Sequence, residues 1–192
     1  MNLSISAYTA LRTDTMKLIL ISDTHLDNDS IPAYLSDILD RYDLIVHAGD
    51  FDSLAFYKAL EATGKLKAVH GNSDEPTVKE LLPEKLVFEV EGVKIGVIHE
   101  AALSIVDYTA TRYMALEMGV DILVFGHIHR PVIEKSDVMI ICPGSPTKPR
   151  MSDPCAVELI IENDSVTPNV IPITGQSCGY INFSRKLGEN SN

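Results

Sequence analysis

Residues 18–25 read LILISDTH, an apolar run that ends abruptly in polar residues. The four apolar residues are typical of a short strand that is covered on both faces. The segment that follows places a carboxylate, Asp23, and an imidazole, His25, at the carboxyl end of that strand. An Asp-x-His pair alone is common by chance, so its meaning depends on how the other strands of the chain end.

Four further apolar runs end in the same way. They are Leu44 to Val46 before HAGD, Leu66 to Val69 before HGNSD, Val93 to Ile98 before His99-Glu100, and Ile122 to Phe125 before GHIHR. Ligands of open α/β sheets bind outside the carboxyl ends of the strands, at a crevice that several strand exits share. We therefore expect these five polar exits to converge on one site.

Helical patterns lie between the apolar runs and indicate an α/β fold. They cover residues 31–41, 53–62, 78–82 and 108–117. The pair Glu91-Gly92 predicts a hairpin turn between strands at 86–90 and 93–98. From about Val132 the pattern becomes strand after strand, with runs at 138–141 and 157–161 and a turn at 163–164, which predicts added antiparallel strands that form a second sheet.

Length and composition favour a single globular domain. The 192 residues are 45% hydrophobic, without low-complexity stretches, and they contain neither a secretory signal nor an apolar run long enough to span a membrane. We expect an extension of little order at residues 1–15, the domain at 16–174 and a loose tail at 175–192. Three cysteines without a metal-binding spacing fit a reducing compartment, so the expected location is the cytoplasm.

The formal net charge of −11 excludes broad electrostatic capture of nucleic acid, so no stable nucleic-acid binding is expected. A phosphate substrate would need positive charge from another source. Bound metal ions are the obvious candidates, because they are often the largest local charges in a site.

The strand exits supply a set of metal-ligating side chains: Asp23, His25, Asp50, Asn72, His99, His127 and His129. Such a mixture of imidazole and oxygen ligands suits Mn²⁺, Fe²⁺, Ni²⁺ or Zn²⁺ better than Mg²⁺ or Ca²⁺. Seven ligands are too many for one such ion and fit two ions with one bridging carboxylate. The alternative is that these polar residues only cap the strand ends through hydrogen bonds.

GHIHR, residues 126–130, contains two of these candidate ligands, His127 and His129, and so raises the question of whether both bind one ion. In extended chain, residues two apart point to the same side, with Cα atoms roughly 6.6 Å apart. That separation is wide for two ligands of one ion, but it suits two ions about 3.5–4 Å apart that each take one ring. The spacing therefore fits two ions that each take one ring, and the alternative is a pair of histidines that cap the strand end through hydrogen bonds.

The ordered motifs resemble those of the calcineurin-like metallophosphoesterase superfamily. They are Asp23-x-His25, Gly49-Asp50, Gly71-Asn72, His99 and Gly126-His127-Ile128-His129, and with Pro143-Gly144-Ser145 they are similar to its small single-domain phosphodiesterase branch. The resemblance runs from about Met16 to Ile173. It implies a four-layer α/β/β/α sandwich with two mixed β-sheets flanked by helices.

The resemblance also implies an activity, a divalent-metal-dependent hydrolysis of phosphodiesters by a hydroxide that bridges two ions. One ion would be held by Asp23, His25 and His129, and the other by Asn72, His99 and His127, with Asp50 bridging. Mn²⁺ is the first expectation for both ions. Asp50, Asn72 and His99 are the expected catalytic residues, the substrate is a small phosphodiester, and the related enzymes suggest that a homo-oligomer is possible.

Two departures from the superfamily pattern bear on the substrate. Ser73 stands where many members have a histidine that assists the leaving group, and Glu100-Ala101 replaces a frequent Gly-His. Two alternatives therefore stay open. One is a phosphomonoesterase or nucleotide phosphatase, and the other is a non-catalytic interaction scaffold like the retromer subunit of this fold.

Several residues beside the motifs are interpreted structurally first. Asp52 is expected to cap a helix, Asp74 to stabilise a turn or bond to the edge of the site, and His47 and His70 to orient ligands or fill the core. Cys142 is expected to be a buried small hydrophobic residue. Arg130 and Arg150 could bind phosphate oxygens or simply lie at the surface.

Overall fold

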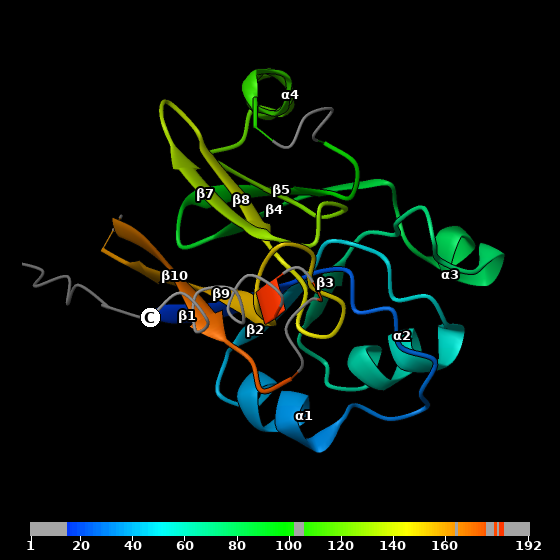
Figure 1. The fold of residues 1–192 in the computed structure, drawn as a ribbon. Helices are drawn as coiled ribbons and strands as arrows, with labels where there is room; N and C mark the ends of the chain where they lie inside the picture. The colour runs from blue at the N-terminus through cyan, green and yellow to red at the C-terminus, as the bar shows by residue number, and fades with distance from the viewer. Residues whose placement is uncertain (1–14, 102–105, 164, 176–178, 180, 183–192) are drawn as a thin grey trace, which may run out of the picture.

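The computed structural model describes residues 15–101, 106–163, 165–175, 179 and 181–182 (Figure 1). The predicted extension at 1–15 and the predicted tail at 175–192 therefore lie almost wholly outside the described residues. The helices are α1 (Ala33–Leu39), α2 (Leu54–Glu61), α3 (Pro76–Leu81) and α4 (Thr109–Met118). Among the described residues, no helix has the length and apolar character needed to cross a membrane.

The first sheet has the strand order β10-β9-β1-β2-β3. It consists of β1 (Met16–Ile21), β2 (Leu44–His47), β3 (Leu66–Ala68), β9 (Cys155–Glu162) and β10 (Ser165–Pro172). The strands β1, β2 and β3 are parallel, and β9 pairs antiparallel with β1. The carboxyl ends of the three parallel strands therefore leave the sheet at the same edge.

The second sheet has the order β4-β5-β6-β8-β7. It consists of β4 (Lys85–Val90), β5 (Val93–Ile98), β6 (Ile122–Phe125), β7 (Pro131–Lys135) and β8 (Met139–Pro143). The strands β5, β6 and β8 are parallel, and β4 pairs with β5 through the predicted turn, where Glu91 and Gly92 have φ of 47° and 80°.

One prediction on the sheets is wrong. The strands after Val132 do not form a second sheet of their own. The strands β7 and β8 extend a sheet that already contains β4, β5 and β6, while β9 and β10 form the antiparallel edge of the first sheet. The pattern of apolar residues marks a strand as buried on one face or on both, but it does not say which strand lies beside it.

The four-layer sandwich is confirmed by the packing (Figure 1). Strand β1 shows how the sequence builds the layers, because successive side chains point to opposite faces of a sheet. Leu18 and Leu20 enter the core between the two sheets, whereas Ile19 and Ile21 enter the core beneath α1, α2 and α3. A third core lies between the second sheet and α4. The two sheets are thus held face to face, with their polar strand exits at one edge.

Candidate metal centre

The exits of β1 and β2 are joined by backbone hydrogen bonds. The Asp23 amide donates to the Gly49 carbonyl at 3.0 Å, and the His25 amide donates to the Asp50 carbonyl at 3.1 Å. The Ser145 hydroxyl, from the loop after β8, donates to the Asp23 carbonyl at 2.7 Å. Three loops from both sheets are thereby fixed around one point.

The backbone at this point is strained. Five of the predicted ligands have left-handed φ values: Asp23 at 53°, His25 at 44°, Asp50 at 62°, His127 at 72° and His129 at 56°. This conformation costs an L-residue roughly 1–2 kcal/mol, although aspartate and histidine tolerate it better than most side chains. Such strain persists only where the surrounding structure enforces it, and it is typical of functional sites.

GHIHR is not extended as expected. The Ile128 amide donates to the Gly126 carbonyl at 2.9 Å, so the chain makes a γ-turn centred on His127, with β6 already ended at Phe125. The premise of an extended segment is therefore wrong. The turn sends the two rings to different neighbours: His129 lies beside His25 and Asp23, and His127 lies beside Asn72.

The first group of candidate ligands consists of Asp23, His25 and His129. His129 Nε2 lies 3.2 Å from Asp23 Oδ1 and 3.3 Å from His25 Nε2. The side chains of Asp23 and His129 are almost fully buried, and that of His25 is 16% exposed. These three residues offer ligand atoms close enough to share one ion.

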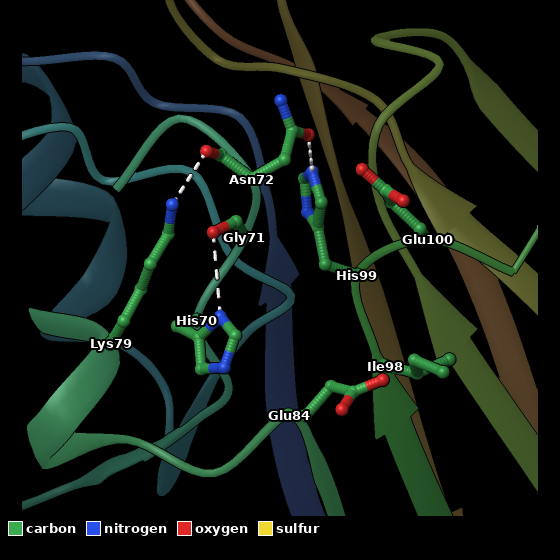
Figure 2. A pocket seen from close by; sticks show the side chains of 8 residues that line it. All are labelled: His70, Gly71, Asn72, Lys79, Glu84, Ile98, His99 and Glu100. Atoms are coloured by element: carbon green, nitrogen blue, oxygen red, sulfur yellow. Dashed lines mark hydrogen bonds between the residues drawn. The ribbon is translucent and has the colours of Figure 1, made fainter. Parts of the chain in front are cut away.

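The second group consists of Asn72, His99 and His127, of which Asn72 and His99 are seen in Figure 2. Asn72 Oδ1 lies 3.0 Å from His99 Nε2 and 3.0 Å from His127 Nδ1. This side of the centre is more open, because the His127 side chain is 44% exposed. Asp50 Oδ2 lies between the groups, 3.6 Å from His25 Nε2 and 3.3 Å from His99 Nε2. The structure thus brings all seven predicted side chains together.

The partners of the outer ring nitrogens identify the tautomers. The Nδ1 atoms of His99 and His129 lie 2.7 Å and 2.5 Å from the carbonyl oxygens of Ala48 and Lys148. A carbonyl oxygen only accepts, so each Nδ1 must carry a proton. His25 Nδ1 donates in the same way to Asp52 Oδ1 at 2.7 Å. When the rings of His25, His99 and His129 are neutral, their Nε2 atoms therefore carry no proton. Each of these Nε2 atoms then directs its lone pair toward a facing nitrogen or oxygen atom at 3.0–3.6 Å.

The close packing of carboxylates and imidazoles in the cluster shifts the pKa values of its side chains. Burial raises the pKa of Asp23, against the charges of His129 and His99. Burial also acts to raise the pKa of Asp50, but the hydrogen bond and charge of His99 outweigh it and hold that pKa well below its ordinary value. The pKa of His99 is raised in turn, because its bond to Asp50 and the charge of Asp23 overcome desolvation. Asp50 and His99 thus stabilise each other's charged forms.

Asp74 positions two motifs at once, a role that the sequence only hinted at. Its buried carboxylate accepts four backbone hydrogen bonds, from the amides of Gly71 at 2.7 Å, Asp50 at 3.1 Å, Phe51 at 2.7 Å and Asp52 at 2.9 Å. One side chain therefore joins the exits of β2 and β3.

The expectation for Asp52 is wrong. The N-cap of α2 is Ser53, whose hydroxyl accepts from the Phe56 amide at 3.2 Å, and Asp52 instead orients His25. Aspartate and serine are both good helix caps, so their adjacency in the sequence leaves the choice open.

The remaining polar neighbours have structural places. His47 is fully buried and satisfied, with Nδ1 accepting from the Gly49 amide at 3.1 Å and Nε2 3.0 Å from the Thr24 hydroxyl. Cys142 is buried at the end of β8, as expected. His70 lines the cavity shown in Figure 2, and Arg130 donates to the Tyr108 hydroxyl at 2.9 Å.

Two glycines are required by this packing. A side chain at Gly126 would meet the Ser22 hydroxyl, the Ala48 carbonyl and the His99 ring, and one at Gly71 would overlap the Asp50 carboxylate. The close approach of the strand exits therefore depends on backbone without Cβ atoms at these positions.

Cavities open on both sides of the cluster. One of about 450 Å³ is lined by His25, Asp52, His129, Lys148, Pro149 and Arg150. The other, of about 360 Å³, borders Asn72 and His99 together with Lys79, Glu84 and Glu100 (Figure 2). A small molecule can therefore reach the candidate ligands from either side.

Known proteins resemble this chain both in sequence and in fold. Residues 16–164 match the family described as the calcineurin-like phosphoesterase superfamily domain. The chain is 35% identical over 173 residues to a probable metallophosphoesterase of Methanothermobacter thermautotrophicus, which covers 88% of this chain and 100% of that relative.

Two solved structures share the fold at lower identity. The vacuolar protein sorting 29 of Cryptosporidium parvum has a TM-score of 0.68 at 19% identity, covering 82% of this chain and 97% of that one. A protein described as a novel archaeal phosphodiesterase has a TM-score of 0.61 at 24% identity, covering 81% of this chain and 100% of that one.

Proposed function

The chain belongs to the calcineurin-like phosphoesterase superfamily, and on that premise we propose that it is a phosphodiesterase that depends on two divalent metal ions. The proposed ligands are the seven side chains of the candidate metal centre. Asp23, His25 and His129 hold one ion, and Asn72, His99 and His127 hold the other. Asp50 would be shared by both ions. Mn²⁺ is the preferred occupant, with Ni²⁺, Fe²⁺ and Zn²⁺ as the other candidates.

The observation that carries the proposal is the set of facing lone pairs. His25 Nε2 and His129 Nε2 lie 3.3 Å apart, while their Nδ1 protons are committed to Asp52 and to the Lys148 carbonyl. Two acceptors at this distance repel each other unless a proton or a cation lies between them. A carboxylate or carbonyl on the outer nitrogen is also the arrangement that fixes metal-binding imidazoles.

The residues of the chain have distinct tasks in this proposal. When bound, paired divalent ions supply Lewis acidity toward phosphoryl oxygens and lower the pKa of a water molecule to near neutrality. Asp50, whose Oδ1 accepts from the Ser73 amide at 2.8 Å, keeps its Oδ2 directed into the centre. Asn72 and His99 form the wall toward the cavity shown in Figure 2, where the phosphate would enter.

Two features favour a diester over a monoester. Ser73 follows Asn72 and uses its amide to hold Asp50, so this position offers no imidazole to protonate a poor leaving group. The likeness in fold to an archaeal phosphodiesterase also supports this choice. The likeness in fold to vacuolar protein sorting 29 supports a scaffold as a second candidate, but the close grouping of the seven candidate ligands favours catalysis.

A matrix of metals and substrates tests the proposal. The protein is loaded with Mn²⁺, Ni²⁺, Fe²⁺ or Zn²⁺ and assayed on bis(p-nitrophenyl) phosphate and on p-nitrophenyl phosphate. We expect preference for the diester and a loss of more than about 100-fold in Asp50→Asn, because even outer partners of ligands cost roughly 10- to 100-fold. Asp121→Asn, far from the centre, is the matched control.

Each outcome of the matrix has a clear meaning. Full activity of Asp50→Asn would contradict a catalytic metal centre. Preference for the monoester would favour the phosphatase alternative, and absence of activity with every metal would favour the scaffold.

A further inference from the structure

Two basic residues beside His129 are held in place by their backbones. The Lys148 carbonyl accepts from His129 Nδ1 at 2.5 Å, and the Arg150 amide donates to the His129 carbonyl at 3.0 Å. Both side chains are exposed and line the cavity that also contains His25 and His129. We call this pair, Lys148 and Arg150, the basic wall.

The basic wall is unusual in so acidic a chain. The formal net charge is −11, yet within the described part of the chain neither basic-wall side chain has a carboxylate within ion-pair distance. Two cations at the rim of a cavity form a site for an anion.

The opposite cavity has the reverse character. Glu84 and Glu100 face it, and Glu100 Oε1 lies 3.9 Å from His127 Nδ1 (Figure 2). The one lysine at this cavity, Lys79, uses its ammonium group to donate to the Asn72 carbonyl at 2.8 Å. The first cavity is therefore lined by two cationic side chains and one carboxylate, Asp52, whereas the second is lined by two carboxylates and one lysine.

From this asymmetry we propose that the substrate carries a second anionic group, apart from the phosphate that is hydrolysed, and that Lys148 and Arg150 bind this group. The inference rests on the proposed function and specifies the substrate class. The ester substituent over the basic wall bears a carboxylate or a phosphate. The substituent over Glu84 and Glu100 is neutral or cationic.

The test measures binding, so that it does not depend on turnover. Calorimetry compares 3-carboxyphenyl phosphate with phenyl phosphate on the Mn²⁺-loaded protein at low ionic strength. These two monoesters resemble the product of hydrolysis and differ by one carboxylate. The wild-type protein should bind the carboxylated ligand roughly two- to tenfold more tightly, as expected for an exposed, charge-assisted contact.

Variants assign the preference to the basic wall. Arg150→Ala and Lys148→Ala should bring the ratio of the two dissociation constants toward one, and Arg150→Lys should retain part of it. Lys94→Ala removes an exposed lysine near the start of β5, at the far end of that strand from His99, and should leave the ratio unchanged. Because the ratio is taken within each variant, a general loss of affinity cancels.

The outcomes separate this inference from the proposed function. A wild-type ratio of one, or a ratio that survives both alanine variants, would overturn the basic wall as an anion site. Hydrolysis of bis(p-nitrophenyl) phosphate is measured separately on the same samples. Its absence would count against the phosphodiesterase proposal, while the binding ratio would still decide the role of the wall.

Discussion

Asp74→Asn is the substitution that most sharply tests how the fold holds the centre. Asp74 Oδ1 accepts from the amides of Phe51 and Asp52, and Oδ2 accepts from those of Asp50 and Gly71. Asparagine has nearly the same shape but only one accepting oxygen. Either orientation of its amide therefore leaves two backbone N–H groups facing an NH₂ donor in a buried site.

The magnitude follows from these bonds. Hydrogen bonds to a charged group contribute about 1.5–3 kcal/mol each, so losing two sets an upper bound near 6 kcal/mol. Burial raises the pKa of Asp74, which means that desolvation of the carboxylate already offsets part of this gain. We therefore expect Asp74→Asn to lower the free energy of unfolding by about 2–4 kcal/mol.

Urea unfolding of the metal-free protein, followed by circular dichroism, measures this change. Asp121→Asn is the matched control, because the Asp121 carboxylate accepts one exposed backbone bond, from the Lys94 amide at 2.8 Å. That variant should lose less than about 1 kcal/mol. The precision of such measurements is about 0.5 kcal/mol. If the free energy of unfolding of Asp74→Asn differed from that of the wild type by less than this, the view that Asp74 joins the two exits would be refuted.

Three further predictions follow from individual side chains. Asp52→Ala should weaken Mn²⁺ binding roughly 10- to 100-fold in calorimetry, because the imidazole that it orients loses its partner; unchanged affinity would contradict that role. His127→Gly should raise the free energy of unfolding of the metal-free protein by about 1 kcal/mol by relieving its φ of 72°, and no gain in urea would argue against stored strain. Burial raises the pKa of Cys155 to about 11 and that of Cys142 still further, so both thiols stay protonated below those values. In a Cys178→Ala background, neither should react with a disulfide reagent at mildly alkaline pH until urea is added, and rapid labelling of the folded protein would refute their burial.

The candidate ligands could be read from the sequence because each follows a short apolar run directly. Hydrophobic runs predict strands locally, and the carboxyl ends of parallel strands meet at one edge whatever the order of the strands. His99 could be predicted as a candidate ligand because it follows β5, without knowing that β5 belongs to the second sheet.

The supports of the ligands could not be read in the same way. The partners of His99 and His129 are the backbone carbonyls of Ala48 and Lys148, and any residue offers such a carbonyl. The placement of β9 beside β1 rests on pairing over more than a hundred residues of chain, which alternation does not encode. The γ-turn at His127 likewise depends on its surroundings, since its φ is unfavourable on its own.

The central claim, that two ions share Asp50, is tested most directly by anomalous diffraction from crystals of the protein loaded with Mn²⁺. The account predicts two manganese peaks about 3.5–4 Å apart, one beside Asp23, His25 and His129 and the other beside Asn72, His99 and His127. A single peak, or none within coordination distance of Asp50, would contradict it.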